Sequence, residues 1–355
     1  MSGRDVRPGG RVTDDKLSVT KMNTHLALLA LAGSIALLAA QDQAATQGET
    51  PSLKLEAKVP IGNVRGRLDH MTIDLARQRL FVAELGNNTV GVVDLNSRNV
   101  IRTLDGLKEP QGVAYLPSAD TLYVANGGDG SVRLFRGPDY KASGQIDLGD
   151  DADNIRLDIP ANRIVVGFGS GGLAVIDAAS SRKIAEIPLS VHPEGFQLAP
   201  GSSRIFVNLP RAQAIAVVDG QSGKQTATWP TKVAGGNFPM ALDHGARRVL
   251  VAFRNPAKLG AYSMDDGSLV ASPDICGDAD DLFVDASRRR VYISCGEGFL
   301  DVLDAAQGAY PRVARIATVA GARTSLFVPE MDRLMLAVRA SGREAAAVWV
   351  YQPAP

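Results

Sequence analysis

The sequence predicts an all-β protein, a seven-bladed β-propeller whose blades each contain four strands. The first observation behind this prediction is an internal repeat, because the stretch Arg79-Leu-Phe-Val82 returns in related form along the chain every 41 to 44 residues. Its copies begin at Arg79, Thr121, Arg163, Arg204, Arg248, Arg290 and Arg333. The second observation is that each repeat holds short apolar runs between turn-forming residues. A four-stranded unit of roughly 40 to 45 residues is typical of a propeller blade, and propellers usually have about four to eight blades.

The first repeat shows the strand pattern most clearly. Its apolar runs, the last of them weaker, cover residues 71–75, 79–83, 90–95 and 100–104. The runs are short and rich in β-branched and aromatic residues, which favours strands over helices. Turn formers such as Gly86-Asn87-Asn88 separate them. We therefore expect four strands in this unit and the same order in the units that follow.

The last repeat is incomplete, since the chain ends after three strand-like runs at residues 325–328, 333–339 and 346–351. A fourth strand must come from elsewhere. Residues 53–59 alternate apolar and charged side chains with period two, as a half-buried outer strand does. We predict that this N-terminal strand pairs with the last blade and closes the ring, which removes an open sheet edge.

The repeats divide the chain into three parts. They fill residues 53–355 without a linker, which predicts a single propeller domain there. Residues 1–40 form a leader that contains an apolar segment at 26–40, and residues 41–52 form a short linker.

The apolar segment 26–40 predicts a signal peptide. A helix of its length, at about 1.5 Å per residue, is shorter than the roughly 30 Å hydrocarbon core of a membrane. Lys16 and Lys21 precede it and polar residues follow it, as in a secretory signal. The alternative is an uncleaved anchor. We expect a periplasmic or secreted protein with no membrane segment in its mature form, and the sequence leaves both Met1 and Met22 open as the start.

The charge balance argues against nucleic acid as a partner. Lys plus Arg and Asp plus Glu both number 38, so the formal net charge is zero. Nucleic-acid binding draws on an excess of basic residues that release counterions from phosphates. We expect a monomer whose partner is a small polar molecule.

The chain has two cysteines, Cys276 and Cys295. Export to an oxidising compartment permits a disulfide. Cys276 lies in the connection into the sixth repeat and Cys295 at the end of that repeat's second strand, two positions that emerge on the same face of a propeller. We predict a bridge, and the alternative is a pair of inert buried thiols.

The repeats resemble the YVTN/YncE-like family of seven-bladed propellers. Tyr123-Val-Ala-Asn126 matches the family's name motif at three of four positions, and the third-strand pattern is matched at Val90–Asp94, Leu173–Asp177 and Ile215–Asp219. The resemblance covers residues 53–355 and implies the fold. Proteins with this architecture include lactonases, lyases and proteins with no known reaction. The matching residues build blades, so they assign no chemistry.

Residues that recur at equivalent positions are expected to be structural. Asp94, Asp177 and Asp219 each follow a third strand and precede a turn, where aspartate caps the backbone. The arginines that open the second strands are expected to join blades or turns.

The connections into the first strands behave differently, because every one carries polar groups and no two carry the same set. In a propeller these connections surround the mouth of the central channel, so they predict a ligand site there. As acid, base or anion-binding groups we predict His70, His192, Arg67 and Arg323. As further ligand-binding groups we predict Asp69, Gln111, Asn126, Asn237 and Glu297. Of these, Asn126 and Glu297 come from the loops after the second strands, which are expected to form a second ring around the channel. As metal ligands we predict Asp153, Asn154, Glu194, Asp280 and Asp281.

Carboxylate and amide oxygens suit a hard divalent cation, so we expect Ca²⁺ or Mg²⁺. The alternative is a transition metal, which the imidazoles of His70 and His192 would bind. Two functions remain open. One is a metal-assisted hydrolase or lyase, similar to the lactonase propellers, in which a histidine moves a proton. The other is a propeller that binds a ligand or another protein without turnover. The glycine-rich stretch 167–172 lies between two predicted strands with no helix following, so it does not indicate a dinucleotide site.

Overall fold

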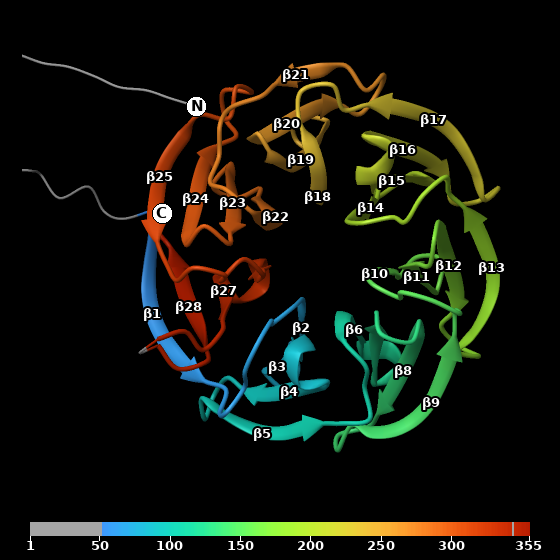
Figure 1. Cartoon of the computed structure of the whole chain (residues 1–355), viewed down its shortest axis with the longest axis vertical. Coiled ribbons are helices and arrows are strands. Elements are labelled where there is room, and N and C mark those ends of the chain that lie inside the picture. The colour runs from blue at the N-terminus through green and yellow to red at the C-terminus, as the bar shows by residue number, and fades with distance from the viewer. Residues whose placement is uncertain (1–51, 343) are drawn as a thin grey trace, which may run out of the picture. The chain divides into compact units, whose positions relative to one another are not determined.

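The computed structural model describes residues 52–342 and 344–355, and in them the predicted fold is confirmed. Seven four-stranded antiparallel sheets stand in a ring, and the helical segments of this part of the chain are single 3₁₀ turns (Figure 1). The leader 1–40, with its signal-peptide and start-site predictions, lies outside the described residues, as does the linker 41–52 except for its last residue.

Six blades are each built from four consecutive strands, with the first strand nearest the axis and the fourth at the outside (Figure 1). Blade 1 contains β2 (Met71–Asp74), β3 (Arg79–Glu84), β4 (Thr89–Asp94) and β5 (Asn99–Leu104). Blade 2 contains β6 (Pro110–Leu116), β7 (Thr121–Asn126), β8 (Ser131–Arg136) and β9 (Lys141–Asp147). Blade 3 contains β10 (Ile155–Asp158), β11 (Arg163–Phe168), β12 (Gly172–Asp177) and β13 (Arg182–Pro188).

The remaining blades follow in chain order. Blade 4 contains β14 (Phe196–Leu198), β15 (Arg204–Leu209), β16 (Ala214–Asp219) and β17 (Lys224–Pro230). Blade 5 contains β18 (Gly235–Asp243), β19 (Arg248–Asn255), β20 (Ala257–Ser263) and β21 (Leu269–Ala271). Blade 6 contains β22 (Ala279–Asp285), β23 (Arg290–Cys295), β24 (Phe299–Asp304) and β25 (Arg312–Ala317). The 3₁₀ turns are η1 (Leu85–Asn87), η2 (Pro117–Ala119), η3 (Pro210–Ala212) and η4 (Pro329–Met331).

Blade 7 closes the ring with strands from both ends of the propeller. It contains β26 (Ser325–Val328), β27 (Arg333–Val338), β28 (Ala347–Pro353) and, outermost, β1 (Leu53–Pro60). The antiparallel ladder between β1 and β28 runs from Leu53 opposite Pro353 to Pro60 opposite Ala347. The predicted closure by an N-terminal strand is therefore confirmed.

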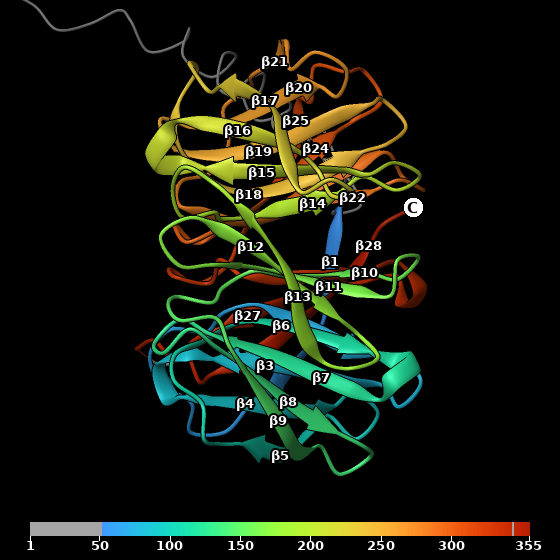
Figure 2. The same cartoon turned by 90° about the vertical axis from the view of Figure 1, so that its right-hand side faces the viewer.

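The core lies between the blades. A middle strand such as β7 is buried at every position because the neighbouring blades cover both of its faces, whereas the outermost β13 is mostly exposed. Seen from the side, β13 crosses in front of the other strands of its blade (Figure 2). Buried apolar clusters fill each junction between neighbouring blades. The ring is thus held by apolar packing between sheets, the main stabilising term in such a fold.

The recurring aspartates and arginines have the structural roles that we expected. Asp94 accepts the backbone N–H of Ser97 at 2.8 Å, and Asp177 accepts that of Ser180 at 2.7 Å, so both cap turns. Three of the recurring arginines, Arg79, Arg163 and Arg204, donate to backbone carbonyls of the next blade. Arg163 donates to the carbonyl of Gly220 at 3.1 Å, joining blade 3 to blade 4.

Two further arginines join blades through carboxylates. Arg77, in the first turn of blade 1, contacts Asp74 of its own blade at 2.7 Å and Asp120 of blade 2 at 2.8 Å. Arg288 occupies the equivalent turn of blade 6. It contacts Asp285 at 3.0 Å and Asp332 of blade 7 at 2.7 Å. The same arrangement of one arginine between two aspartates therefore joins blade 1 to blade 2 and blade 6 to blade 7.

The sulfur atoms of Cys276 and Cys295 are bonded, with their Cα atoms 5.8 Å apart. The bridge ties the end of β23 to the connection that leads into β22 of the same blade. Both side chains are fully buried.

Closure by β1 predicts a contrast within one strand. Val59 is 1% exposed and packs between blades 7 and 1, whereas Leu55 is 41% exposed. Val59→Ala should lower the free energy of unfolding by about 1–3 kcal/mol, because it leaves a cavity in the core. Leu55→Ala should change it by less than about 0.5 kcal/mol. Equal effects of the two changes in denaturant titrations would mean that β1 does not hold the ring.

Loss of the disulfide should cost stability without changing the fold. Replacing Cys276 and Cys295 together by Ala should lower the free energy of unfolding by about 3 kcal/mol, the chain-entropy estimate for a loop of about 20 residues. Reduction of the unaltered protein should give a similar loss. The check is denaturant unfolding with and without reductant, and titration of two free thiols in the unreduced, denatured protein would contradict the bridge.

Candidate functional site

The innermost strands bring residues from all seven blades to the axis in matching positions. In each innermost strand one residue pairs with the fourth residue of the second strand of the same blade, and these residues are Met71, Val113, Ile155, Phe196, Met240, Leu282 and Ser325. The residues two positions earlier form what we call the upper layer: Asp69, Gln111, Asp153, Glu194, Phe238, Asp280 and Arg323. The residues one position later form the lower layer: Thr72, Ala114, Arg156, Gln197, Ala241, Phe283 and Leu326. Both layers line one axial cavity of about 800 Å³.

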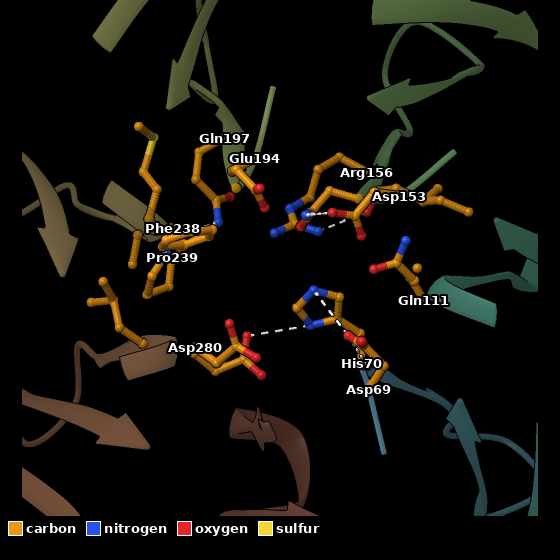
Figure 3. A pocket seen from close by; sticks show the side chains of 18 of the residues that line it. Asp69, His70, Gln111, Asp153, Arg156, Glu194, Gln197, Phe238, Pro239 and Asp280 are labelled. Carbon is orange, nitrogen blue, oxygen red and sulfur yellow. Dashed lines mark hydrogen bonds and ion pairs between the residues drawn. The ribbon is translucent and has the colours of Figure 1, made fainter. Parts of the chain in front are cut away.

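Most of the predicted site residues meet in this cavity. Those that line it are Arg67, Asp69, His70, Gln111, Asp153, Asn154, His192, Glu194, Asp280, Asp281 and Arg323. Figure 3 labels His70 and the upper-layer residues Asp69, Gln111, Asp153, Glu194, Phe238 and Asp280 around the cavity. These residues converge because every connection into an innermost strand ends beside the axis of the propeller.

Three predicted residues do not line the cavity and brace loops instead. Asn126 accepts the backbone N–H of Lys108 at 3.0 Å and donates to Ser131. Asn237 is fully buried and donates to the side chain of Asn208 and to the carbonyl of Ala214. Glu297 accepts the backbone N–H of Gly277 at 2.8 Å.

The structure adds wall residues that were not among the predicted site residues. Arg156 and Gln197 lie within the innermost strands β10 and β14, and Phe238 and Arg254 lie in blade 5. Aligning the repeats would have found the first two, because their positions are held by threonine, alanine, phenylalanine or leucine in the other blades.

One side of the upper layer is neutralised by arginines. Asp280 is bound by Arg254 and, at 2.8 Å, by Arg323. Asp278, beside them, contacts the same two arginines at 3.2 and 2.9 Å. Burial raises the pKa of Asp280, and the two arginines offset part of that shift. The guanidinium of Arg254 also lies over the ring of Phe238, 3.9 Å from its centre.

His70 is a cation held between carboxylates. Its Nδ1 is 3.5 Å from Asp281 and its Nε2 is 3.7 Å from Asp69. Burial disfavours the charged ring, but Asp281 and then Asp69 outweigh it and raise the pKa of His70 to about 10. The second oxygen of Asp281 accepts the backbone N–H of Ser325 at 2.8 Å. Arg67 contacts Asp69 at 2.8 Å. Asp69 and Asp281 therefore both have a cationic partner within the protein, Asp69 in Arg67 and His70 and Asp281 in His70.

Asp153 and Glu194 are the carboxylates of the upper layer without such a cation. They belong to the neighbouring blades 3 and 4, and within residues 52–342 and 344–355 neither has a Lys, Arg or His nitrogen within 4.0 Å. Asp153 accepts only a side-chain N–H of Asn154, at 3.3 Å. Burial raises the pKa of both carboxyls to about 7, with Glu194 adding to the shift of Asp153 and Asp280 to that of Glu194. The pair therefore titrates near neutral pH.

His192 is held at the edge of the cavity. Its Nδ1 lies 2.6 Å from the carbonyl oxygen of Gly169, so this nitrogen carries the proton and donates it. The carboxylate of Asp151 lies 3.6 Å from the same nitrogen. His192 is thereby oriented, with its Nε2 as the remaining polar atom of the ring.

The predicted metal ligands fall into two groups. Asp280 and Asp281 contact arginine and histidine, whereas Asp153, Asn154 and Glu194 line the cavity without such a contact among the described residues. In the part of the chain that the structure describes, no group of three or more His, Cys, Asp and Glu side chains is arranged to hold a metal ion. The divalent metal stays a prediction.

Comparisons with known protein families and curated sequences assign no function, so the functional argument rests on the fold and the cavity. The chain matches no protein-family model and no curated protein sequence. Over the described ranges, no helix has the length and apolar character needed to cross a membrane.

The charge on His70 predicts a pH-dependent contribution to stability. The folded protein keeps the proton up to about pH 10, whereas the unfolded chain releases it near pH 6.5. The stabilisation is thus complete below pH 6.5 and is lost as the pH rises toward 10. The loss of unfolding free energy in His70→Gln should be largest near pH 6 and shrink toward pH 10. A pH-independent loss, or an imidazole NMR titration of His70 near or below pH 6.5, would contradict the assignment.

Proposed function

We propose that the protein binds a small polar ligand in the axial cavity, and that Asp153 and Glu194 bind a cationic group of that ligand. The observation that supports this most is the pair itself: two carboxylates from neighbouring blades face the cavity without a cation, while the other upper-layer carboxylates have one. The cavity volume lies within the usual range for small-molecule sites, about 300–1,000 Å³.

An ammonium group fits this pair chemically. Buried carboxyls with raised pKa values are destabilised in their ionised form, and a cation placed between them favours ionisation. Binding should therefore release a proton near neutral pH and strengthen as the pH rises from about 6 to about 8. Gln111, in the same layer, offers further hydrogen-bonding atoms to the polar part of a ligand.

A metal-assisted hydrolase or lyase is the second candidate, and one observation favours it. Carboxyls that titrate near neutral pH are suited to accept and donate protons in catalysis. Asp153, Asn154 and Glu194 are the residues that would hold Ca²⁺ or Mg²⁺, which when bound would polarise a substrate oxygen. Kinship with the YVTN/YncE-like propellers, supported by the repeat motifs, allows this lactonase-like chemistry. Export to the periplasm or the medium and a monomeric state remain predictions.

The proposal is tested by calorimetric titration of small primary alkylamines and, in parallel, of CaCl₂ and MgCl₂ at pH 8. Glu194→Gln should weaken amine binding by about tenfold or more, the usual loss for one charge-assisted contact in a buried site. Glu330→Gln, a change in the exposed turn η4, serves as the control and should bind like the unaltered protein.

The pH dependence gives a second readout. Amine affinity should rise between pH 6 and pH 8 in the unaltered protein, and this rise should be smaller in Glu194→Gln, which lacks one of the two titrating groups. Binding of the divalent metals instead of amines, lost in the same variant, would favour the hydrolase or lyase. No heat from either class of ligand would contradict both.

A further inference from the structure

We infer that the cavity has a second subsite, in which Arg156 binds an anionic group, so that the ligand is a small zwitterion carrying an ammonium and a carboxylate group. This inference rests on the proposed function, because it assigns the other end of the same ligand. The arginines of the cavity wall differ in whether a carboxylate of the protein contacts them.

Most of these arginines already bind carboxylates. Arg67 contacts Asp69, and Arg254 and Arg323 share Asp278 and Asp280. Arg211 lies in the exposed turn η3. Arg156 is half-buried in β10, and within the described part of the chain no carboxylate lies within 4.0 Å of its guanidinium.

Arg156 has no carboxylate in direct contact. One of its terminal nitrogens donates to the carbonyl of Ile155 at 2.8 Å, which accounts for one of the five N–H donors of a guanidinium. The guanidinium also lies over the ring of Phe196, 5.5 Å from its centre. Burial lowers the pKa of Arg156, the carboxylates of Asp281 and Asp153 oppose part of that shift, and an arginine stays charged at neutral pH. Burying a cation whose donors are mostly unused is costly, and a ligand anion bound to them would reduce that cost.

The lower layer around Arg156 contains no acid. Its other members are Thr72, Ala114, Gln197, Ala241, Phe283 and Leu326, of which the alanines leave room and the glutamine is polar. Gln197 donates its amide nitrogen to the carbonyl of Met240 at 2.7 Å. The acidic upper layer and the lower layer are three residues apart along each strand, about 10 Å of extended chain. Positive and negative groups of a ligand thus meet opposite charges in different layers.

The charge balance of the whole wall agrees with a ligand of no net charge. Six carboxylates line the cavity, from Asp69, Asp151, Asp153, Glu194, Asp280 and Asp281, and five arginines with the protonated His70 balance them. A divalent cation would add two charges to this balanced wall. A zwitterion adds none, and it gives both Arg156 and the carboxylate pair a partner. Figure 3 shows Arg156, Asp153 and Glu194 among the side chains that line one cavity.

The test is calorimetric titration of the purified protein at pH 8 with unbranched amino acids from glycine to 6-aminohexanoate, each compared with the alkylamine of equal chain length. Phosphoethanolamine, which carries phosphate in place of carboxylate, is included as a separate arm. At least one amino acid should bind about tenfold or more tightly than its amine. Arg156→Met should remove this advantage and leave the amine within about twofold, since the carboxylate pair is intact.

Two further variants complete the design. Arg156→Lys keeps the charge but loses the planar fork, so it should retain part of the advantage. Arg102→Met removes an exposed arginine of the outer strand β5 and should change neither affinity. If amines bind and depend on Glu194 but amino acids bind no better, the second subsite is wrong and the proposed function stands. If Arg156→Met weakens amine and amino acid equally, the subsite is wrong as well. If neither class binds, both proposals fail.

Discussion

The antiparallel pairing of β1 with β28 is the interaction on which the rest of the structure depends. Each blade packs its two faces against its neighbours, so a ring that stayed open would expose an apolar face on each of its two end blades and a row of unpaired backbone groups. The ladder from Leu53 to Pro60 supplies the fourth strand of blade 7 from the other end of the propeller. Once the ring is closed, the positions of the innermost strands around the axis follow from the register of the seven sheets.

Closure has an electrostatic consequence at the axis. The connections into the innermost strands are polar, and convergence forces their charges into one cavity. Most of these charges cancel in contacts between blades, such as Asp280 with Arg254 and Arg323, or His70 with Asp281. Like charges left uncancelled would destabilise the ligand-free fold. The remaining groups, Asp153 with Glu194 and separately Arg156, are therefore the ones for which a bound partner would have the largest effect.

The fold was predictable because it is repeated. The repeat, the short apolar runs and the incomplete last unit were enough to predict the number of blades and the closing strand. The axial cavity was predictable in outline, since residues that differ between repeats at one position, such as Asp153 and Glu194, need a reason other than blade construction. Asn126 and Asn237 fit the same pattern, yet their buried side chains bond backbone groups instead of facing the cavity. Asn126 donates to the carbonyl of Ser131 in its own hairpin, and Asn237 to that of Ala214 in blade 4.

Other features of the site could not be read from the sequence alone. Aligning the repeats would single out Arg156 as the one charged residue at its position, but the sequence does not show which groups its guanidinium contacts. The pairing of His70 with Asp281 joins blades 1 and 6, which are distant along the chain, so only the closed ring reveals it. Which carboxylates keep a cation and which do not is a property of that three-dimensional pairing, and the candidate function rests on it.

Asp153 and Glu194 are carboxyls at the axis whose burial outweighs the distant cations His70 and Arg254, so that their pKa values are raised. The raised pKa values are tested most directly by carbon-13 NMR titration of the side-chain carboxyls in labelled protein, with signals assigned from Asp153→Asn and Glu194→Gln. We expect two carboxyls that titrate near pH 7 and are assigned to these two residues. Titration of both at the values usual for exposed carboxyls, at or below about pH 5, would contradict it.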